Sequence, residues 1–250
     1  MVIGSRETFR DPTWSMGSME KKKRISFRII LIMILILGGS AMLLYPMISY
    51  KVSSQKQTQT VRAYSEAVER YTEEDYAEFR RKAEEYNASL IGKENPFLLT
   101  EEEEAWYASL LDLDGTGIMG YVEIPRIGEL LPIYHGCSGT VLEEAAGHVP
   151  WSALPVGGES THCVIPGHRG SAASKLFTDL DDMQIGDEFY LHVLDETLVY
   201  CVDQILVTNP GDPNPLRIVD GEDYCTLYTC TPFGINTQRL LVRGHRLNDA

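Results

Sequence analysis

The sequence has few basic residues for its length. Its 250 residues contain 22 Lys+Arg against 36 Asp+Glu, which gives a formal net charge of −14. A surface with this excess of negative charge repels the phosphate backbone of nucleic acids, so nucleic-acid binding is excluded. Hydrophobic residues nevertheless make up 44% of the chain. This is ample material for a core, and wholesale disorder is therefore excluded as well.

Residues with the spacing of a metal site are also lacking. Cys225 and Cys230 have no second pair of ligands at the spacing that a zinc site requires. The acidic residues between 212 and 223 do not have the regular ligand spacing or the glycine position of an EF-hand loop. We therefore expect no metal site in this chain.

Cysteine is scarce, and its number is odd. The five cysteines are Cys137, Cys163, Cys201, Cys225 and Cys230. An odd number cannot pair completely within one chain, so at least one thiol is free. We expect four of the five to be small buried hydrophobic residues, the commonest environment of a free cysteine. Cys230 is the candidate for a reactive thiol.

Long apolar stretches are limited to one, at residues 29–48. About 20 apolar residues match a hydrocarbon core about 30 Å thick. A basic cluster at residues 21–24 precedes this stretch, so the positive-inside rule places residues 1–24 in the cytoplasm and the chain from about residue 50 onward outside the cell. We predict an uncleaved single-pass transmembrane anchor at residues 25–50, in the cell membrane.

The alternative is a cleaved secretory signal. The apolar stretch is long for a signal peptide, and no clear small-residue cleavage site precedes Tyr50. Residues 1–18 have the character of a vector-derived leader or a misplaced start, because Met19 begins a more ordinary anchor sequence.

Residues 51–116 are predicted to form a helical region. After a polar spacer at residues 53–60, apolar residues recur at spacings of three and four up to Leu90, which predicts an α-helix that ends at Gly92. Thr100 and Glu103 have the spacing of a capping box, which predicts the start of a further helix.

Residues 117–250 have a different pattern, with short β-type segments separated by Gly and Pro. Strands are predicted near 118–124, 130–134, 162–166, 188–194, 197–207, 225–230 and 239–245, and short helices at 140–147 and 172–182. Many short strands with frequent turn signals favour a β-barrel or a β-sandwich. The fold class is therefore mainly β.

The segment at residues 226–244 is predicted to form a strand, a loop and a second strand. If these strands pair antiparallel, Cys230 at the end of the first and Arg239 at the start of the second are neighbours. A nearby guanidinium favours the thiolate form of a cysteine and supplies donors for a developing oxyanion. A structural arginine beside a buried cysteine fits the same pattern, so both interpretations stay open.

His168 is the histidine best placed to act as a base. It follows an apolar strand and lies in Pro166-Gly167-His168-Arg169-Gly170, where the glycines allow close approach of backbone and partners. Catalytic side chains are often presented on such loops. Of the other five, we expect His162 and His192 to be structural, and His135, His148 and His245 to lie in surface turns.

Three motifs in this order resemble the signature of the sortases, the membrane-tethered cysteine transpeptidases of Gram-positive bacteria. They are Gly-His-Arg-Gly at 167–170, Thr-Leu-Tyr-Thr-Cys at 226–230, and the arginine nine residues after that cysteine. The similarity extends over about residues 117–246 and is to the pilus-assembling class C branch. The resemblance implies a sortase-like closed β-barrel with short helices at residues 117–250, preceded by a helical lid region and a transmembrane helix.

The resemblance also implies the chemistry. Cys230 would be the nucleophile, His168 the general acid and base, and Arg239 the residue that orients and stabilises the oxyanion. The enzyme would cleave a Leu-Pro-x-Thr-Gly-like sorting signal through a thioacyl intermediate and join it to a lysine amine of the next pilin subunit. No metal or organic cofactor is implied, and the partners would be pilin subunits and the membrane.

Two alternatives stay open. One is a housekeeping-type sortase, which attaches proteins to a cell-wall precursor. The other is a non-catalytic surface binding module on the same barrel.

Class C sortases usually carry an Asp-Pro-aromatic lid over the active cysteine, and the matching place here is Asn95-Pro96-Phe97. Phe97 can still cover a thiol, but Asn95 cannot form the ion pair that the family's aspartate makes with the catalytic arginine. We therefore expect weaker lid closure; an ordinary interhelix loop is the alternative. The sequence also lacks the C-terminal hydrophobic segment usual in this class, which predicts either a truncated chain or a single anchor.

Overall fold

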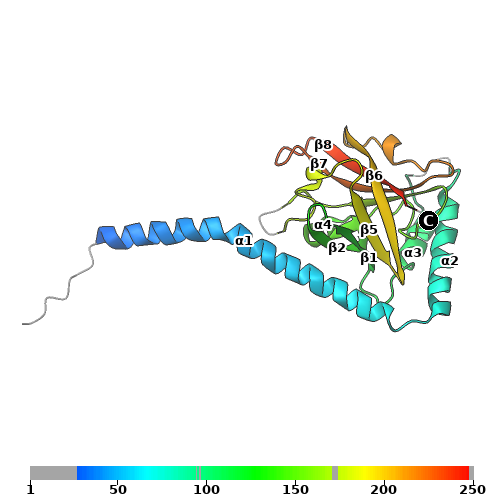
Figure 1. The fold of residues 1–250 in the computed structure, drawn as a ribbon, viewed down its shortest axis with the longest axis horizontal. Helices are drawn as coiled ribbons and strands as arrows, with labels where there is room; N and C mark the ends of the chain where they lie inside the picture. The colour runs from blue at the N-terminus through cyan, green and yellow to red at the C-terminus, as the bar shows by residue number, and fades with distance from the viewer. Residues whose placement is uncertain (1–26, 94, 96, 171–173, 248–250) are drawn as a thin grey trace, which may run out of the picture. The chain divides into compact units, whose positions relative to one another are not determined.

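The structure is a computed structural model that describes residues 27–93, 95, 97–170 and 174–247. The chain divides into two compact units, residues 1–42 and 43–250, and the second unit holds the β-sheet (Figure 1). The helices are α1 (Phe27–Val68), α2 (Glu73–Leu90), α3 (Glu101–Ala108) and α4 (Gly139–Glu144), with two 3₁₀ turns, η1 (Leu180–Asp182) and η2 (Asn214–Leu216). Pro96 of the predicted lid lies outside the described residues.

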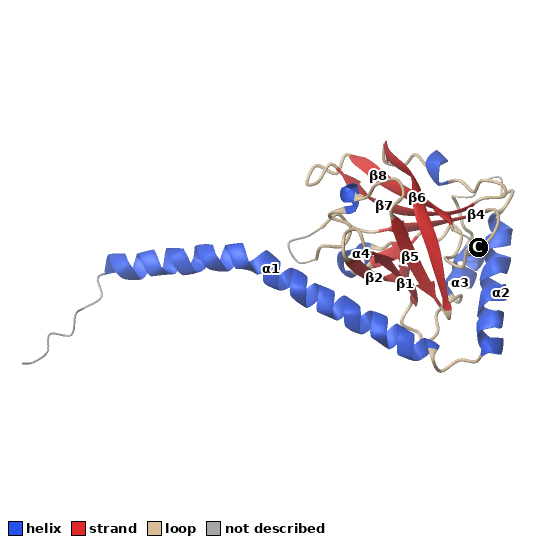
Figure 2. Cartoon of the chain, in the orientation of Figure 1, coloured by secondary structure: helices blue, strands red, loops and turns tan. Residues whose placement is uncertain are grey.

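Eight strands form one sheet (Figure 2). They are β1 (Ile118–Ile124), β2 (Glu129–His135), β3 (Ala146–His148), β4 (Thr161–Pro166), β5 (Glu188–Val193), β6 (Glu196–Thr208), β7 (Asp223–Thr231) and β8 (Gln238–Arg246). Their order is β3-β2-β1-β5-β6-β8-β7-β4. The Val149 N–H, next to β3, donates to the Val164 carbonyl of β4 at 3.1 Å, which brings the two outer strands together. The sheet is thus a nearly closed barrel, and the predicted fold class is confirmed.

All seven predicted strands are present, and the short strand β3 was not predicted. The helix expected at 140–147 ends earlier, at Glu144, and β3 begins at Ala146. The helix expected at 172–182 is wrong, because among its described residues only η1 is helical. Leu176 within it has φ of 43°, in the left-handed region, which an α-helix cannot accommodate.

Helix α1 contains the predicted apolar stretch. Among the described residues it is the one helix long and apolar enough to cross a membrane. The polar spacer expected at 53–60 is instead helical. It contains no Gly or Pro, and both of its threonine hydroxyls are satisfied within the helix: Thr58 and Thr60 donate to the carbonyls four residues earlier, at 2.9 and 3.1 Å.

The helical region up to Leu90 is divided in two, because α1 ends at Val68 and α2 begins at Glu73. Thr72 caps α2 in a capping box with Asp75. The sequence contains this signal, but the apolar periodicity continues across it and therefore predicts one uninterrupted helix. The predicted capping box of Thr100 and Glu103 is confirmed at the start of α3.

Strands β4, β7 and β8 pack apolar residues on both faces. Cys163 and Cys225 lie in the main core, together with Tyr86 of α2 and Tyr107 of α3. Residues of the opposite parity on β4 and β8, Val164 and Leu241, belong to a second, smaller cluster with Val149, Leu216 and Tyr228. We call the side facing the main core the inner face and the side of the smaller cluster the outer face.

Candidate active site

Three strand ends meet at one end of the sheet. Strand β4 runs parallel to β7, with Thr161 opposite Asp223 and Pro166 opposite Tyr228. Strand β8 runs antiparallel to β7, with Arg239 opposite Cys230. The predicted pairing of Cys230 with Arg239 is therefore confirmed, and β4 ends beside the same place.

The register of β4 and β7 continues past the end of β4. The Thr229 hydroxyl donates to the Gly167 carbonyl at 2.8 Å, and Arg169 Nη1 donates to Thr231 Oγ1 at 3.1 Å. These two contacts flank the position at which His168 lies opposite Cys230. His168, two residues beyond the end of β4, thus lies in line with the paired residues Cys230 of β7 and Arg239 of β8, and neighbouring backbones of such a ladder are about 5 Å apart. We call these three residues the 168–230–239 row.

The row lies on the outer face. Alternate residues of a strand share a face, and Tyr228 and Leu241, two residues from Cys230 and Arg239, both belong to the outer cluster. Cys225, five residues before Cys230, lies in the main core on the inner face. The two thiols of β7 are therefore on opposite sides of the sheet.

The side chains of the row are accessible. His168 is exposed, and Cys230 and Arg239 are half-buried. Arg239 Nε donates to the Tyr228 hydroxyl at 3.1 Å, and Nη1 donates to the carbonyls of Asn236 and Gln238 at 3.2 and 3.0 Å. Among the described residues no carboxylate pairs with Arg239. Its positive charge is therefore not neutralised by the protein and is available to an anionic oxygen.

Arg169 differs from Arg239 in that its side chain is buried and forms an ion pair. Its side chain is only 6% exposed and forms an ion pair with Asp181. Besides its bond to Thr231, the guanidinium lies 5.8 Å from the ring centroid of Phe233, in the loop between Cys230 and Arg239. Arg169 therefore ties the segment after His168 to the loop after Cys230, with its charge already paired.

The surroundings of the other histidines separate them from His168. The rings of His135, His148, His162 and His192 all form hydrogen bonds within the described residues. Burial lowers the pKa of His162 to about 4, so its ring is neutral. His245 pairs with Tyr224 at the other end of β8. His168 is the one histidine of the described residues in the row of Cys230.

The predicted surroundings of three histidines and two cysteines are wrong. His148 is fully buried, not in a surface turn: its Nδ1 lies 3.0 Å from the Tyr107 hydroxyl and its Nε2 2.8 Å from the Ala153 carbonyl. His135 and His245 lie in strands β2 and β8. Among the cysteines expected to be buried, Cys163 and Cys225 are, whereas Cys201 is half-buried and Cys137 is exposed.

The glycines around His168 have the predicted role. A Cβ on Gly167 would lie 2.6 Å from the Phe177 ring, and one on Gly170 would overlap Thr178 Oγ1. Neither position has room for a side chain. The Phe177 N–H donates to the His168 carbonyl at 3.1 Å. The close packing that glycine permits thus fixes the backbone on both sides of His168.

An apolar cavity of about 430 Å³ adjoins the row on the outer face. Its walls include Pro166 and Tyr228, each two residues before a member of the row, and Val164. Phe97 of the predicted lid also lines it. The Phe97 ring meets Trp151 edge-on at 5.0 Å between centroids and lies 5.2 Å from the Arg217 guanidinium, whereas Asn95 is exposed.

Comparison with known proteins agrees with this architecture. A family model described as the sortase domain matches residues 122–247. The structure of sortase C1 from Streptococcus agalactiae is 45% identical, with a TM-score of 0.73, over 77% of this chain and 100% of that one. Sortase C of Streptococcus pneumoniae is 44% identical, with a TM-score of 0.68, over 76% and 97%. Sortase A of Bacillus anthracis is 26% identical over 225 residues, 89% of this chain and 95% of the relative.

A barrel with this strand order and these relatives defines the class of protein, a cysteine transpeptidase. The chain belongs to the sortase family, and its similarity to the sortase C structures places it in class C. The resemblance recognised from the motifs is therefore confirmed.

Proposed function

We propose that this chain is a pilus-assembling transpeptidase that cleaves a Leu-Pro-x-Thr-Gly-like sorting signal and joins it to a lysine amine of the next pilin subunit. The observation that supports the proposal is the 168–230–239 row: a thiol, an imidazole and a guanidinium without a carboxylate partner among the described residues, all at one end of the sheet. Similarity to sortase C structures supports the pilin substrate, since the Streptococcus pneumoniae structure is one that bears on pilin substrate specificity.

In the first half-reaction, the Cys230 thiolate attacks the carbonyl carbon of the Thr–Gly amide. The negative charge that develops on the carbonyl oxygen is stabilised by the N–H groups of Arg239, whose charge is not engaged by a carboxylate among the described residues. Protonated His168 donates its proton to the leaving glycine amine as the C–N bond breaks. The products are a Cys230 thioester of the threonine and the released C-terminal peptide.

In the second half-reaction, a lysine amine attacks the thioester carbon. Neutral His168 accepts a proton from that amine, Arg239 again stabilises the oxyanion, and the Cys230 thiolate leaves as the isopeptide bond forms. The histidine and the thiol thereby return to their starting state. The acidic exterior of the chain attracts a cationic acceptor such as lysine.

The cavity beside the row fits the apolar part of the sorting signal. Its wall is formed by Val164, Pro166 and Tyr228, on the face that carries Cys230. A leucine and proline bound there would leave the following threonine beside the thiol. Because Phe97 lies in the same cavity, the segment around it acts as a lid that the signal must displace. Because Asn95 is neutral, the lid has no carboxylate at this position to form an ion pair with Arg239.

The chain is proposed to have the topology that its sequence predicts. Residues 1–24 are cytoplasmic, residues 25–50 anchor the protein in the membrane by one helix, and residues 51–116 and 117–250 form an extracellular lid region and catalytic barrel. Helix α1, with its apolar stretch preceded by basic residues, supports this arrangement.

The test is to incubate the enzyme with a candidate pilin that carries both a sorting signal and an acceptor lysine. We expect covalent ladders on a denaturing gel, and none with Cys230→Ala. If only a wall-precursor amine is accepted, the housekeeping type is correct. If neither acceptor reacts and Cys230 shows no pH-dependent hyper-reactivity, the chain is a binding module.

A further inference from the structure

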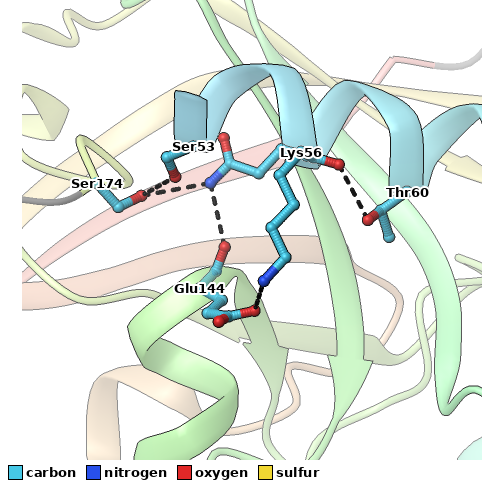
Figure 3. Close-up of polar contacts among 6 residues, drawn as sticks. Ser53, Lys56, Thr60, Glu144 and Ser174 are labelled. Atoms are coloured by element: carbon cyan, nitrogen blue, oxygen red, sulfur yellow. Dashed lines mark hydrogen bonds and ion pairs between the residues drawn. The ribbon is translucent and has the colours of Figure 1, made fainter. Parts of the chain in front are cut away.

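Helix α1 forms hydrogen bonds to the segment that follows His168. Figure 3 shows Ser53, on the part of α1 that belongs to the barrel unit, pointing at Ser174. The Ser53 hydroxyl donates to Ser174 Oγ at 3.0 Å, and Gln57 Nε2, one turn further along the helix, approaches the same oxygen at 3.4 Å. A hydroxyl oxygen has two acceptor lone pairs, so Ser174 can receive both.

Gln57 joins the same place to helix α4. It is only 6% exposed, although most glutamines are exposed. Its second amide hydrogen donates to the carbonyl of Glu144, the last residue of α4, at 3.1 Å (Figure 3). That carbonyl has no partner inside its own helix. A buried amide that satisfies two groups on different segments fixes their relative position.

The segment that begins at Ser174 is linked to His168 by two backbone contacts. Arg169 forms a β-bridge with Leu176, and the Phe177 N–H donates to the His168 carbonyl at 3.1 Å. Ser174 lies two residues before Leu176, the first residue of this segment that forms one of these two contacts. The next residue is held separately, since Lys175 Nζ donates to the Ile127 carbonyl at 2.9 Å and lies 3.5 Å from Glu129.

We propose that Ser53 and Gln57 of α1 are positioning residues for His168, which they hold opposite Cys230 through Ser174. The inference rests on the proposed role of His168 as general acid and base. It gives the part of the helix that follows the apolar stretch a role in catalysis as well as in attachment. Because Lys175 holds the loop independently, loss of the α1 contacts loosens His168 without releasing it.

The experiment uses the full chain in detergent and an internally quenched Leu-Pro-Glu-Thr-Gly peptide. Ser53→Ala together with Gln57→Leu is expected to lower kcat by about ten-fold and to change KM by less than about two-fold, because proton transfer depends on sub-ångström placement, whereas neither Ser53 nor Gln57 lines the binding cavity. Hydrogen exchange of the amides at 174–177 should become about ten-fold faster.

Two further variants, Thr60→Ala and Ser53→Thr, give the controls. Thr60→Ala removes a hydroxyl from the same helix that bonds only to the Lys56 carbonyl of its own turn, so it should behave as wild type. Ser53→Thr keeps the hydroxyl and should restore the kcat that Ser53→Ala loses. Thermal unfolding of each variant shows whether a loss of kcat reflects loss of the fold.

The outcomes separate this inference from the proposed function. Unchanged exchange at 174–177, or faster exchange with unchanged kcat, overturns the positioning role while an inactive His168→Ala leaves the proposed function standing. Full activity of His168→Ala removes the proposed function, and the inference with it. A fall in kcat that is equal in the Thr60→Ala variant also overturns it, because the effect would then be a general one on α1.

Discussion

Strand β7 carries two cysteines that have different surroundings. Cys225 is fully buried in the main core, and burial raises its pKa well above the ordinary value. Cys230 is half-buried on the outer face, opposite the guanidinium of Arg239. They are five residues apart, an odd number, so the alternation of a strand places them on opposite faces.

We therefore expect the face of the strand on which a cysteine lies, and not the strand itself, to decide whether its thiol is reactive. A thiol that is fully buried on the inner face is out of reach of a substrate, so it contributes to packing. A thiol on the outer face at the strand end has an accessible row neighbour on each side. The same backbone therefore supplies a structural residue and the proposed nucleophile.

The largest expected effect separates the two thiols directly. Cys230→Ala should abolish formation of the thioester and of the joined product, because no other group of the row is a nucleophile. Cys225→Ala should retain turnover per folded molecule and lower the free energy of unfolding by about 1 kcal/mol, through loss of buried contacts. Mass spectrometry of the acyl-enzyme and chemical denaturation measure the two effects. Appreciable turnover by the Cys230 variant would refute the assignment.

The histidines of β4 and its following loop give a second contrast. His168→Ala should lower kcat/KM by about 10²- to 10⁴-fold, the usual contribution of general acid–base catalysis, with little change in stability. His162→Gln should instead lower the stability and leave kcat/KM nearly unchanged, because His162 is buried and its Nε2 lies 2.7 Å from Thr226 Oγ1. Steady-state kinetics and thermal unfolding on both variants test this; a similar loss of kcat/KM in both would remove the distinction.

Much of this arrangement could be predicted from local sequence, and the failures have identifiable causes. Alternating apolar residues and turn signals gave seven strands, and motif order gave the candidate row. The buried state of His148 could not be predicted, because its partner Tyr107 is 41 residues away on α3. Residues 53–60 of α1 are predicted as a polar spacer, although a polar stretch without Gly or Pro continues a helix once carbonyls of the preceding turn accept its threonine hydroxyls.

The pKa of His162 predicts a pH effect on stability that is separate from catalysis. Burial lowers this pKa from about 6.5 to about 4, so the unfolded chain binds a proton over that range that the folded chain does not. Stability from this residue is therefore complete above pH 6.5 and falls by up to about 3 kcal/mol as the pH decreases to 4. The difference between wild type and His162→Gln in denaturation measured from pH 7 to pH 4 isolates the effect from the titration of carboxylates. A constant difference would mean that the ring takes up its proton at the same pH in the folded and the unfolded chain, which would refute the lowered pKa.

The smallest expected effect concerns access to the outer thiol. Phe97 lines the cavity beside the row and rests on Trp151, without an ion pair from Asn95 to keep it there. Phe97→Ala should therefore increase the rate at which iodoacetamide modifies Cys230 by about three-fold, since we expect the lid to be only weakly closed, and leave Cys225 unmodified. Leu98→Ala is the matched control, because Leu98 is 68% exposed and does not line the cavity. Equal rates in all three proteins would show that this segment is an interhelix loop, and the protection of Cys230 would then come from the strand end alone.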